Sequence, residues 1–398
     1  MKIAAVVTVW SKNSHADVIV GKFLRGFPTD DGVVAPSGKV VSLYMDQVGP
    51  LDSASANFSA LDDLGTQLAE KYGVRLCGSI AEALCLGGSE VAVDGILAIG
   101  EHGDYPVNSK GQRLYPRRHF WEQITGVLST SERRSQIPIF TDKHLAVTWE
   151  DARWIYDTGK ELGLVHMAGS SVPHCFWRDP WLEHPVDSNI EAAVMLSYGD
   201  LEAYGYHGLE ALEAMIERRP GGEAGVKAIQ TLVGDNIWAA AAEGRWSLPL
   251  AQHALGLVDT GDEPAADAAA TASGDAAVAA VRAACGSDAA LFLLEYNDGF
   301  RAALLHGQGQ GSIIGGWAYA AQVDGSVVGT AFNGTCSTWR LECFCATPTR
   351  YCLDPTQLRQ IGICARVVQL SRNHGLHAGN EAPNYPPFSY LARNIGAC

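Results

Sequence analysis

The chain has 398 residues, of which 47% are hydrophobic and 18% are charged. This length is enough for two domains, and this balance is typical of chains that bury a sizeable core. The formal net charge of −15 excludes general binding to nucleic acid or to an anionic membrane surface, because both need a basic protein surface.

The N-terminus, the hydropathy and the cysteines indicate a cytoplasmic protein. Residues 3–9 (IAAVVTV) have no small-residue cleavage site after them, so they are more typical of a buried first strand than of a signal peptide. No apolar run reaches the roughly 18 residues that a membrane span needs. Five of the ten cysteines fall between Cys336 and Cys364 without the C-x2-C pairs of a zinc site, which favours free thiols in a reducing compartment.

Short apolar runs alternate with helical patterns over the first 170 residues. The pattern predicts strands at 3–9, 39–45, 74–76, 93–99, 137–140 and 164–168. It predicts helices at 15–24, 57–72, 79–85, 118–128 and 148–162, with Ser14 as an N-cap and Gly73 as a stop. Strands separated by helices imply a doubly wound parallel sheet, in which ligands bind beyond the carboxyl ends of the strands.

The pattern changes beyond residue 170. A strand at 190–200 and a helix at 206–218 come before a break at RRPGG, and residues 259–290 have the Ala/Asp-rich composition of a linker or an exposed helix. Antiparallel strands joined by Asn-Asp-Gly and Asp-Gly turns are expected at 290–298, 301–306, 316–323 and 326–332. The expected organisation is a Rossmann-like domain at 1–170 and an α/β substrate or oligomerisation domain at 171–398, with an open, mainly antiparallel sheet.

Polar residues follow two of the predicted parallel strands. Lys143 and His144 come after the strand at 137–140, and Glu101, His102 and Asp104 come after the strand at 93–99. All of them therefore fall on the binding edge of the sheet. A lysine in a dry cleft is a proton donor or acceptor near neutral pH, because burial disfavours its ammonium form. The alternative is a surface lysine just ahead of a helix.

The same stretches contain candidate metal ligands. Carboxylate and imidazole ligands together suit Zn, Mn or Fe. The residues that would supply them are Glu101, His102, Asp142 and His144. The alternative is a polar loop that only caps the structure after it.

Four motifs occur in an order that is found in a known family. Residues 142–152 read DKHLAVTWEDA, and LAEKYGV, SIAEAL and VDGILAIG begin at 68, 79 and 93. This order resembles the Gfo/Idh/MocA oxidoreductases, in which E-K-P-L-A precedes a helix that begins x-T-x-E-E-A. The resemblance covers 1–170 and, more loosely, 185–240. It implies an NAD(P)-binding Rossmann domain, a homo-oligomer, and an oxidoreductase acting on a sugar, polyol or amino-acid-like substrate.

The resemblance also implies roles for single residues. Lys143 falls on the family lysine that contacts the substrate and the nicotinamide and assists proton transfer. The family motif D-x-G-x-H-x-x-D corresponds to residues 203–210, so His207 would take a hydroxyl proton and Glu210 would orient it, although Ala203 replaces the first acid. Substrate contacts are expected from His102, Asp104, His144, His174 and Arg178.

The glycine loop is the main departure from the family. Val7, Val9 and Lys12 stand at its three glycine positions, and a Cβ there blocks the close approach of a pyrophosphate. The replacement loop still offers hydroxyls, a cation and a helix N-terminus to an anion. Asp46 ends the second strand, where an acid holds a ribose hydroxyl in NAD enzymes. The candidate residues for NAD or NADP are Trp10, Ser11, Lys12, Ser14, His15, Asp46 and Glu101.

Three hypotheses follow from these residues. The first is a nicotinamide-dependent oxidoreductase in which Lys143 and His207 transfer the proton. The second is a non-redox enzyme on the same scaffold, with or without a metal, that has lost the usual NAD binding. The third is a non-catalytic accessory protein, for which replacing Lys143 by alanine would leave the cellular role intact. A fold does not choose among them.

Overall fold

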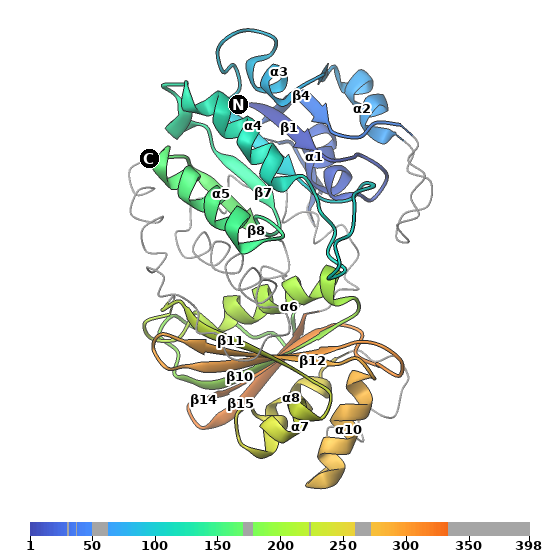
Figure 1. Ribbon diagram of the computed structural model, residues 1–398, viewed down its shortest axis with the longest axis vertical. Coiled ribbons are helices and arrows are strands. Elements are labelled where there is room, and N and C mark those ends of the chain that lie inside the picture. The colour runs from blue at the N-terminus through green and yellow to red at the C-terminus, as the bar shows by residue number, and fades with distance from the viewer. Residues whose placement is uncertain are drawn as a thin grey trace. The chain divides into compact units, whose positions relative to one another are not determined.

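The structure is a computed structural model that describes residues 1–29, 32–36, 38–49, 63–169, 178–222, 224–258 and 272–332. Within these ranges the chain forms two compact units, one up to residue 169 and one from residue 178 (Figure 1). Each unit has its own sheet and its own hydrophobic core. None of the helices in the described part of the chain combines the length and the hydropathy that crossing a bilayer requires.

The first unit contains a parallel six-stranded sheet in the order β5-β4-β1-β6-β7-β8. Chain order runs outward from β1 to β5 on one side and from β6 to β8 on the other. The switch point of this doubly wound sheet therefore lies between β1 and β6. The strands are β1 (Lys2–Val7), β4 (Lys39–Met45), β5 (Arg75–Cys77), β6 (Gly95–Ile99), β7 (Ile139–Asp142) and β8 (His166–Gly169).

The helices of this unit begin and end where the sequence signals them. Ser14, Ser79 and Thr148 each accept a backbone N–H at a helix start, and Gly73 closes a helix in the left-handed conformation at φ 64°. The helices are α1 (His15–Arg25), α2 (Leu64–Tyr72), α3 (Ile80–Cys85), α4 (Arg117–Ser129) and α5 (Trp149–Glu161). A short hairpin of β2 (Phe27–Thr29) and β3 (Gly32–Val34) and a 3-10 turn (Arg134–Gln136) complete the unit. The predicted helix start at 57 lies outside the described residues.

The second unit contains a mixed seven-stranded sheet in the order β11-β12-β13-β10-β14-β15-β9. Only β10 and β13 are parallel neighbours, so the sheet is mainly antiparallel and the predicted fold class is confirmed. The strands are β9 (Arg178–Asp179), β10 (Ile190–Tyr198), β11 (Val226–Val233), β12 (Ala290–Tyr296), β13 (Arg301–Gly307), β14 (Trp317–Val323) and β15 (Ser326–Phe332).

Helices lie on both faces of the second sheet. Gly208 of α6 (Leu201–Ile216) lies so close to Ser197 and Leu304 that a Cβ would clash with both. Val194 and Leu196 of β10 belong to a core with residues of the helices on the opposite face. Those helices are α7 (Asp235–Ala242), α8 (Leu248–Leu255) and α10 (Asp275–Cys285). The homo-oligomer implied by the family resemblance stays a prediction.

Three expectations for this half of the chain need comment. The helix predicted at 206–218 begins five residues earlier, because Asp200 caps it by accepting from the Ala203 N–H. Strand β10 is inserted between β13 and β14, an order that turn residues do not reveal. Residues 259–271, His174 and the cysteines from Cys336 to Cys364 lie outside the described residues.

Candidate functional site

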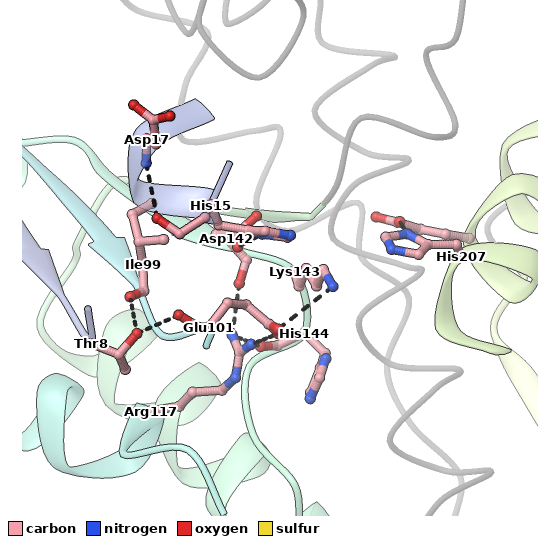
Figure 2. A network of polar contacts seen from close by, with 12 residues as sticks. Thr8, His15, Asp17, Ile99, Glu101, Arg117, Asp142, Lys143, His144 and His207 are labelled. Carbon is pink, nitrogen blue, oxygen red and sulfur yellow. Dashed lines mark hydrogen bonds and ion pairs between the residues drawn. The ribbon is translucent and has the colours of Figure 1, made fainter. Parts of the chain in front are cut away.

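The carboxyl ends of β1, β6 and β7 bring together the polar residues of the first unit. Asp142 is the last residue of β7, Glu101 follows β6 by two residues, and His15 is the first residue of α1. Thr8, directly after β1, donates its hydroxyl to the Glu101 carbonyl and so joins the two strands at the switch point. Figure 2 shows the resulting network, which lies where ligands bind in doubly wound sheets.

Arg117 is the organising cation of this network. Its side chain is 2% exposed and pairs with the Glu101 carboxylate. Its Nη1 donates to the backbone carbonyls of Asp142 at 2.7 Å and His144 at 2.9 Å (Figure 2). One guanidinium therefore ties the segment after β7 to the carboxylate after β6, and the planar fork of arginine suits such multiple contacts.

Lys143 lies between Asp142 and His144, whose backbone carbonyls both accept from Arg117. Its backbone has φ 63°, a left-handed conformation that is uncommon for a residue other than glycine. Its N–H donates to the Gly169 carbonyl at 2.9 Å. These contacts fix an unusual backbone conformation, as is often seen at functional sites, and they direct the side chain toward Glu101.

The Lys143 ammonium forms an ion pair with Glu101, with Nζ 3.6 Å from Oε2 (Figure 2). The lysine side chain is 12% exposed and the glutamate side chain 8% exposed. Burial alone would raise the pKa of Glu101, but the charges of Lys143 and Arg117 hold it well below its ordinary value. Glu101 is therefore ionised at neutral pH and is the anionic partner of Lys143.

A second carboxylate orients a histidine beside this pair. Asp142 accepts from Nδ1 of His15 at 2.5 Å, with the acid 3% and the imidazole 28% exposed. Burial would raise the pKa of Asp142, and the charge and the hydrogen bond of His15 lower it. His102 packs edge-on against His15 with ring centroids 4.8 Å apart, and burial lowers the pKa of His102 to about 3.

The predicted metal ligands lie in this region, but the two carboxylates among them form ion pairs with basic side chains. Glu101 pairs with Arg117 and Lys143, and Asp142 pairs with His15. Among the described residues, no group of three or more His, Cys, Asp or Glu side chains is arranged to hold a metal ion. The metal hypothesis gains no support from the structure.

Asp46, the acid predicted to hold a cofactor ribose, is hydrogen-bonded within the chain. Asp46 accepts from the Tyr44 hydroxyl at 2.9 Å on one oxygen and from the Tyr105 hydroxyl at 2.7 Å on the other. Burial and these bonds raise the pKa of Tyr44 to about 12 and raise that of Tyr105 further. Both carboxylate oxygens that a ribose would approach are thus already hydrogen-bonded.

The N-terminus of α1 is occupied by an acidic residue. Asp17 accepts from the Asn13 N–H at 3.0 Å and from Arg25 at 2.8 Å. The Ser14 hydroxyl accepts from the N–H groups of Ser11 at 3.2 Å and Asp17 at 3.3 Å. Backbone donors that would bind a pyrophosphate in a Rossmann domain are therefore used internally, and a carboxylate stands beside them.

Residues 101–105 lie over the ends of β1 and β4. The Gln47 side chain bonds the backbone of Asp104 in both directions, at 2.8 and 2.9 Å. A Cβ on Gly103 would come within 3.1 Å of the Val9 side chain and 2.9 Å of the Gln47 side chain. This segment therefore lies against the sheet edge at which ligands bind in doubly wound folds.

The remaining predicted residues of the first unit differ in exposure. Lys12 and Asp104 have exposed side chains, whereas Trp10 and Ser11 are each 3% exposed. Within the described residues, the Trp10 indole N–H and the Ser11 hydroxyl have no hydrogen-bond partner. His144 is 5% exposed and its carbonyl accepts from Arg117. His174 and the side chain of Arg178 lie outside the described residues.

In the second unit, His207 and Glu210 lie one turn apart on α6. The distance from His207 Nδ1 to Glu210 Oε2 is 3.7 Å, longer than a hydrogen bond. Glu210 is fully buried and accepts from the Tyr206 hydroxyl at 2.9 Å. The His207 ring, 12% exposed, packs edge-on against Trp317 at 5.7 Å. The proposed role of this pair in proton transfer stays a prediction.

Arg117 and Tyr105 were not predicted as site residues. Arg117 opens α4 beside the similar Arg118, and only long-range contacts distinguish the two: Arg118 is half-buried and stacks on Trp154 at 3.6 Å. Tyr105 lies in the GEHGDYP segment, whose histidine and acids are more usual site residues than a tyrosine. Its contact with Asp46 spans 59 residues, so no local signal marked it.

No protein-family model matches this sequence, and no curated protein matches it. Among solved structures the chain is similar to GenD2 from gentamicin A biosynthesis, solved in complex with NAD, at 11% identity over 96% of this chain and 97% of that chain, with a TM-score of 0.53. Two weaker matches are a scyllo-inositol dehydrogenase from Lactobacillus casei (8% identity, 94% and 92% covered, TM-score 0.47) and a myo-inositol dehydrogenase from Corynebacterium glutamicum (10%, 94% and 96%, 0.47). The first likeness shows a shared fold and no more than the fold.

Proposed function

We propose that this chain is an enzyme that acts on a small polar substrate by proton transfer, with Lys143 as the group that gives or takes the proton. The main support for the proposal is the way in which the fold holds the Lys143 amine. Lys143 is 12% exposed, lies 3.6 Å from an ionised carboxylate, and has a backbone fixed by Arg117 on both sides. A surface lysine ahead of a helix would have none of these constraints.

The redox form of this proposal is a dehydrogenase acting on a sugar, a polyol or an amino-acid-like compound. It is supported by the shared fold with GenD2, which was solved with NAD, and by the resemblance to Gfo/Idh/MocA oxidoreductases. In this form Lys143 would contact the substrate and assist the transfer of its hydroxyl proton. His207 is the proton-transfer residue proposed in the second unit, and NAD(P) would supply the hydride chemistry.

The residues of the first unit do not fit NAD(P) in its usual docking. Asp46 is bound by two tyrosines, Asp17 accepts the Asn13 N–H just ahead of α1, and the 101–105 segment is bonded to Gln47 after β4. This disagreement favours the second candidate function, a non-redox proton-transfer enzyme such as a lyase, hydrolase or isomerase on the same scaffold.

We predict that the purified protein does not bind NAD⁺ or NADP⁺ through the edge of this sheet. A ligand present at 100 times its Kd stabilises the folded state by about 2.7 kcal/mol. For a unit of this size that corresponds to a rise of about 5–10 °C in the unfolding midpoint. Differential scanning fluorimetry with NAD⁺, NADP⁺ and nicotinamide mononucleotide is expected to show no such rise. A rise with the dinucleotides alone would restore the redox form.

Turnover in deuterated water tests the proposed function directly. Proton NMR of a panel of sugars, polyols, hydroxy acids and keto acids detects both loss of substrate and exchange of carbon-bound protons. We expect wild-type protein to act on at least one member without added nicotinamide, and the Lys143→Met variant to be inactive on it. Equal behaviour of the two proteins on every member would remove Lys143 from the chemistry.

A further inference from the structure

His15 and Asp142 form a second acid–base unit that neither Lys143 nor a cofactor role explains. The sequence suggested His15 as an anion-binding residue and Asp142 as a metal ligand. In the structure the two are hydrogen-bonded to each other, with Nδ1 of His15 at 2.5 Å from Oδ2 of Asp142 (Figure 2). The pair joins the start of α1 to the end of β7, residues that are 127 positions apart in the chain.

The exposures of the two side chains are unequal, as proton transfer requires. The Asp142 side chain is 3% exposed, so its carboxylate is shielded from solvent and directed at the imidazole. The His15 side chain is 28% exposed, so part of the imidazole reaches solvent while Asp142 holds Nδ1. His166 shows the contrast, because its Nε2 bonds Thr141 at 3.1 Å and its ring packs on Trp121 rather than beside a carboxylate.

The positions of both side chains are fixed by the fold. Asp142 ends a strand, and its carbonyl accepts from Arg117 at 2.7 Å. His15 begins α1 directly after its N-cap, Ser14. In Figure 2 the His15 ring and the Lys143 amine both point away from the ends of β1 and β6. Glu101 experiences the charges of both groups, which places them in one electrostatic neighbourhood.

Hydrogen-bond chemistry then determines the roles of the ring nitrogens. A carboxylate can only accept, so Nδ1 carries the proton and Nε2 holds a lone pair in the neutral ring. This is the arrangement in which a buried acid orients an imidazole as a general base. We propose that His15 is a catalytic residue that takes a proton from a substrate hydroxyl or a water on Nε2, and that Asp142 positions it.

The step balances within the site. The substrate O–H bond breaks, the proton and the Nε2 lone pair form an N–H bond, and the electron pair stays on the substrate oxygen. The resulting imidazolium is stabilised by Asp142, which remains ionised, and the cationic Lys143 stabilises the oxygen anion. This proposal rests on the proposed function, because it supplies a base beside the ion pair of Lys143 and Glu101.

Hydrolysis of p-nitrophenyl acetate probes His15 without knowledge of the natural substrate. The lone pair of Nε2 attacks the acetyl carbon, p-nitrophenolate leaves, and water hydrolyses the acetyl-imidazole to acetate. We expect His15→Gln to lower the rate of p-nitrophenolate release about fivefold or more, and Asp142→Asn to lower it by a similar factor. His119→Gln, which changes an exposed histidine on α4, is the matched control and is expected to retain the wild-type rate.

Two further measurements keep the outcomes separate. Because Asp142 is buried, its variant is compared only if circular dichroism shows the wild-type fold, and His15→Asn provides a second test of the base. Nitrogen-15 NMR of histidine-labelled protein is expected to show the Nδ1–H tautomer at His15. A wild-type hydrolysis rate in both His15 variants, or an Nε2–H tautomer, would overturn the proposal. If neither His15 variant slows ester hydrolysis but turnover still depends on Lys143, the His15 proposal fails and the proposed function stands.

Discussion

Replacing Arg117 by methionine is expected to lower the unfolding midpoint of the protein by about 6–20 °C, at about 2–4 °C for each kcal/mol. The guanidinium is 2% exposed and pairs with Glu101, which is 7% exposed. Its loss leaves Glu101 with only the more distant Lys143 amine, and breaking a buried ion pair costs about 3–5 kcal/mol. The carbonyls of Asp142 and His144 would also lose their donor.

Arg118→Met is the matched control for this effect. Arg118 lies next to Arg117 on the same helix but is 32% exposed, and it pairs with half-exposed Glu122 and Asp151. Exposed pairs of this kind contribute about 0–1 kcal/mol. Scanning calorimetry of the two variants measures the difference, and similar midpoints would show that Arg117 is not the organising cation of the site.

A double variant separates charge from packing. Adding Glu101→Met to Arg117→Met also removes the carboxylate that has lost its guanidinium partner. Replacing both partners of a buried ion pair by apolar residues is often close to neutral. We therefore expect the double variant to be more stable than Arg117→Met alone. A further drop would indicate that Glu101 contributes mainly through Lys143.

The elements of the first unit were predictable because their signals are local. Side-chain hydroxyls at Ser14, Ser79 and Thr148 cap helices through contacts three residues away, and Gly73 takes the left-handed conformation that ends a helix. Strand order in the second sheet depends on contacts between distant segments. Strand β10 pairs with β13 and β14, which are far from it in sequence, and the local pattern contained no signal for this pairing.

The same distinction separates the predicted and unpredicted parts of the site. Lys143 and Glu101 were placed on one edge because each follows a parallel strand, and the structure brings them to 3.6 Å. The partners of Asp142 and Asp46 could not be predicted, since His15 and Tyr105 are 127 and 59 residues away from them. An acid at a strand end is compatible with a metal, a ribose or a neighbouring side chain, and only the folded chain distinguishes these.

Lys143→Met is expected to lower turnover of whichever panel compound the wild type uses by about 10²–10⁴-fold, the usual contribution of a positioned acid or base. The fold is expected to survive, because Glu101 keeps its pair with Arg117 when the amine is removed. At 1.36 kcal/mol for each tenfold change, this loss corresponds to about 3–5 kcal/mol of barrier.

Lys143→Arg separates the two roles that the amine could have. A guanidinium keeps the positive charge and can still pair with Glu101, but it does not release a proton near neutral pH. If Lys143 transfers the proton, the arginine variant is expected to be as inactive as the methionine variant, whereas a purely electrostatic role predicts partial activity. Lys71→Met, on the exposed side of α2, is the control for loss of a lysine. Wild-type turnover in Lys143→Met would remove Lys143 from the chemistry proposed for this edge of the sheet.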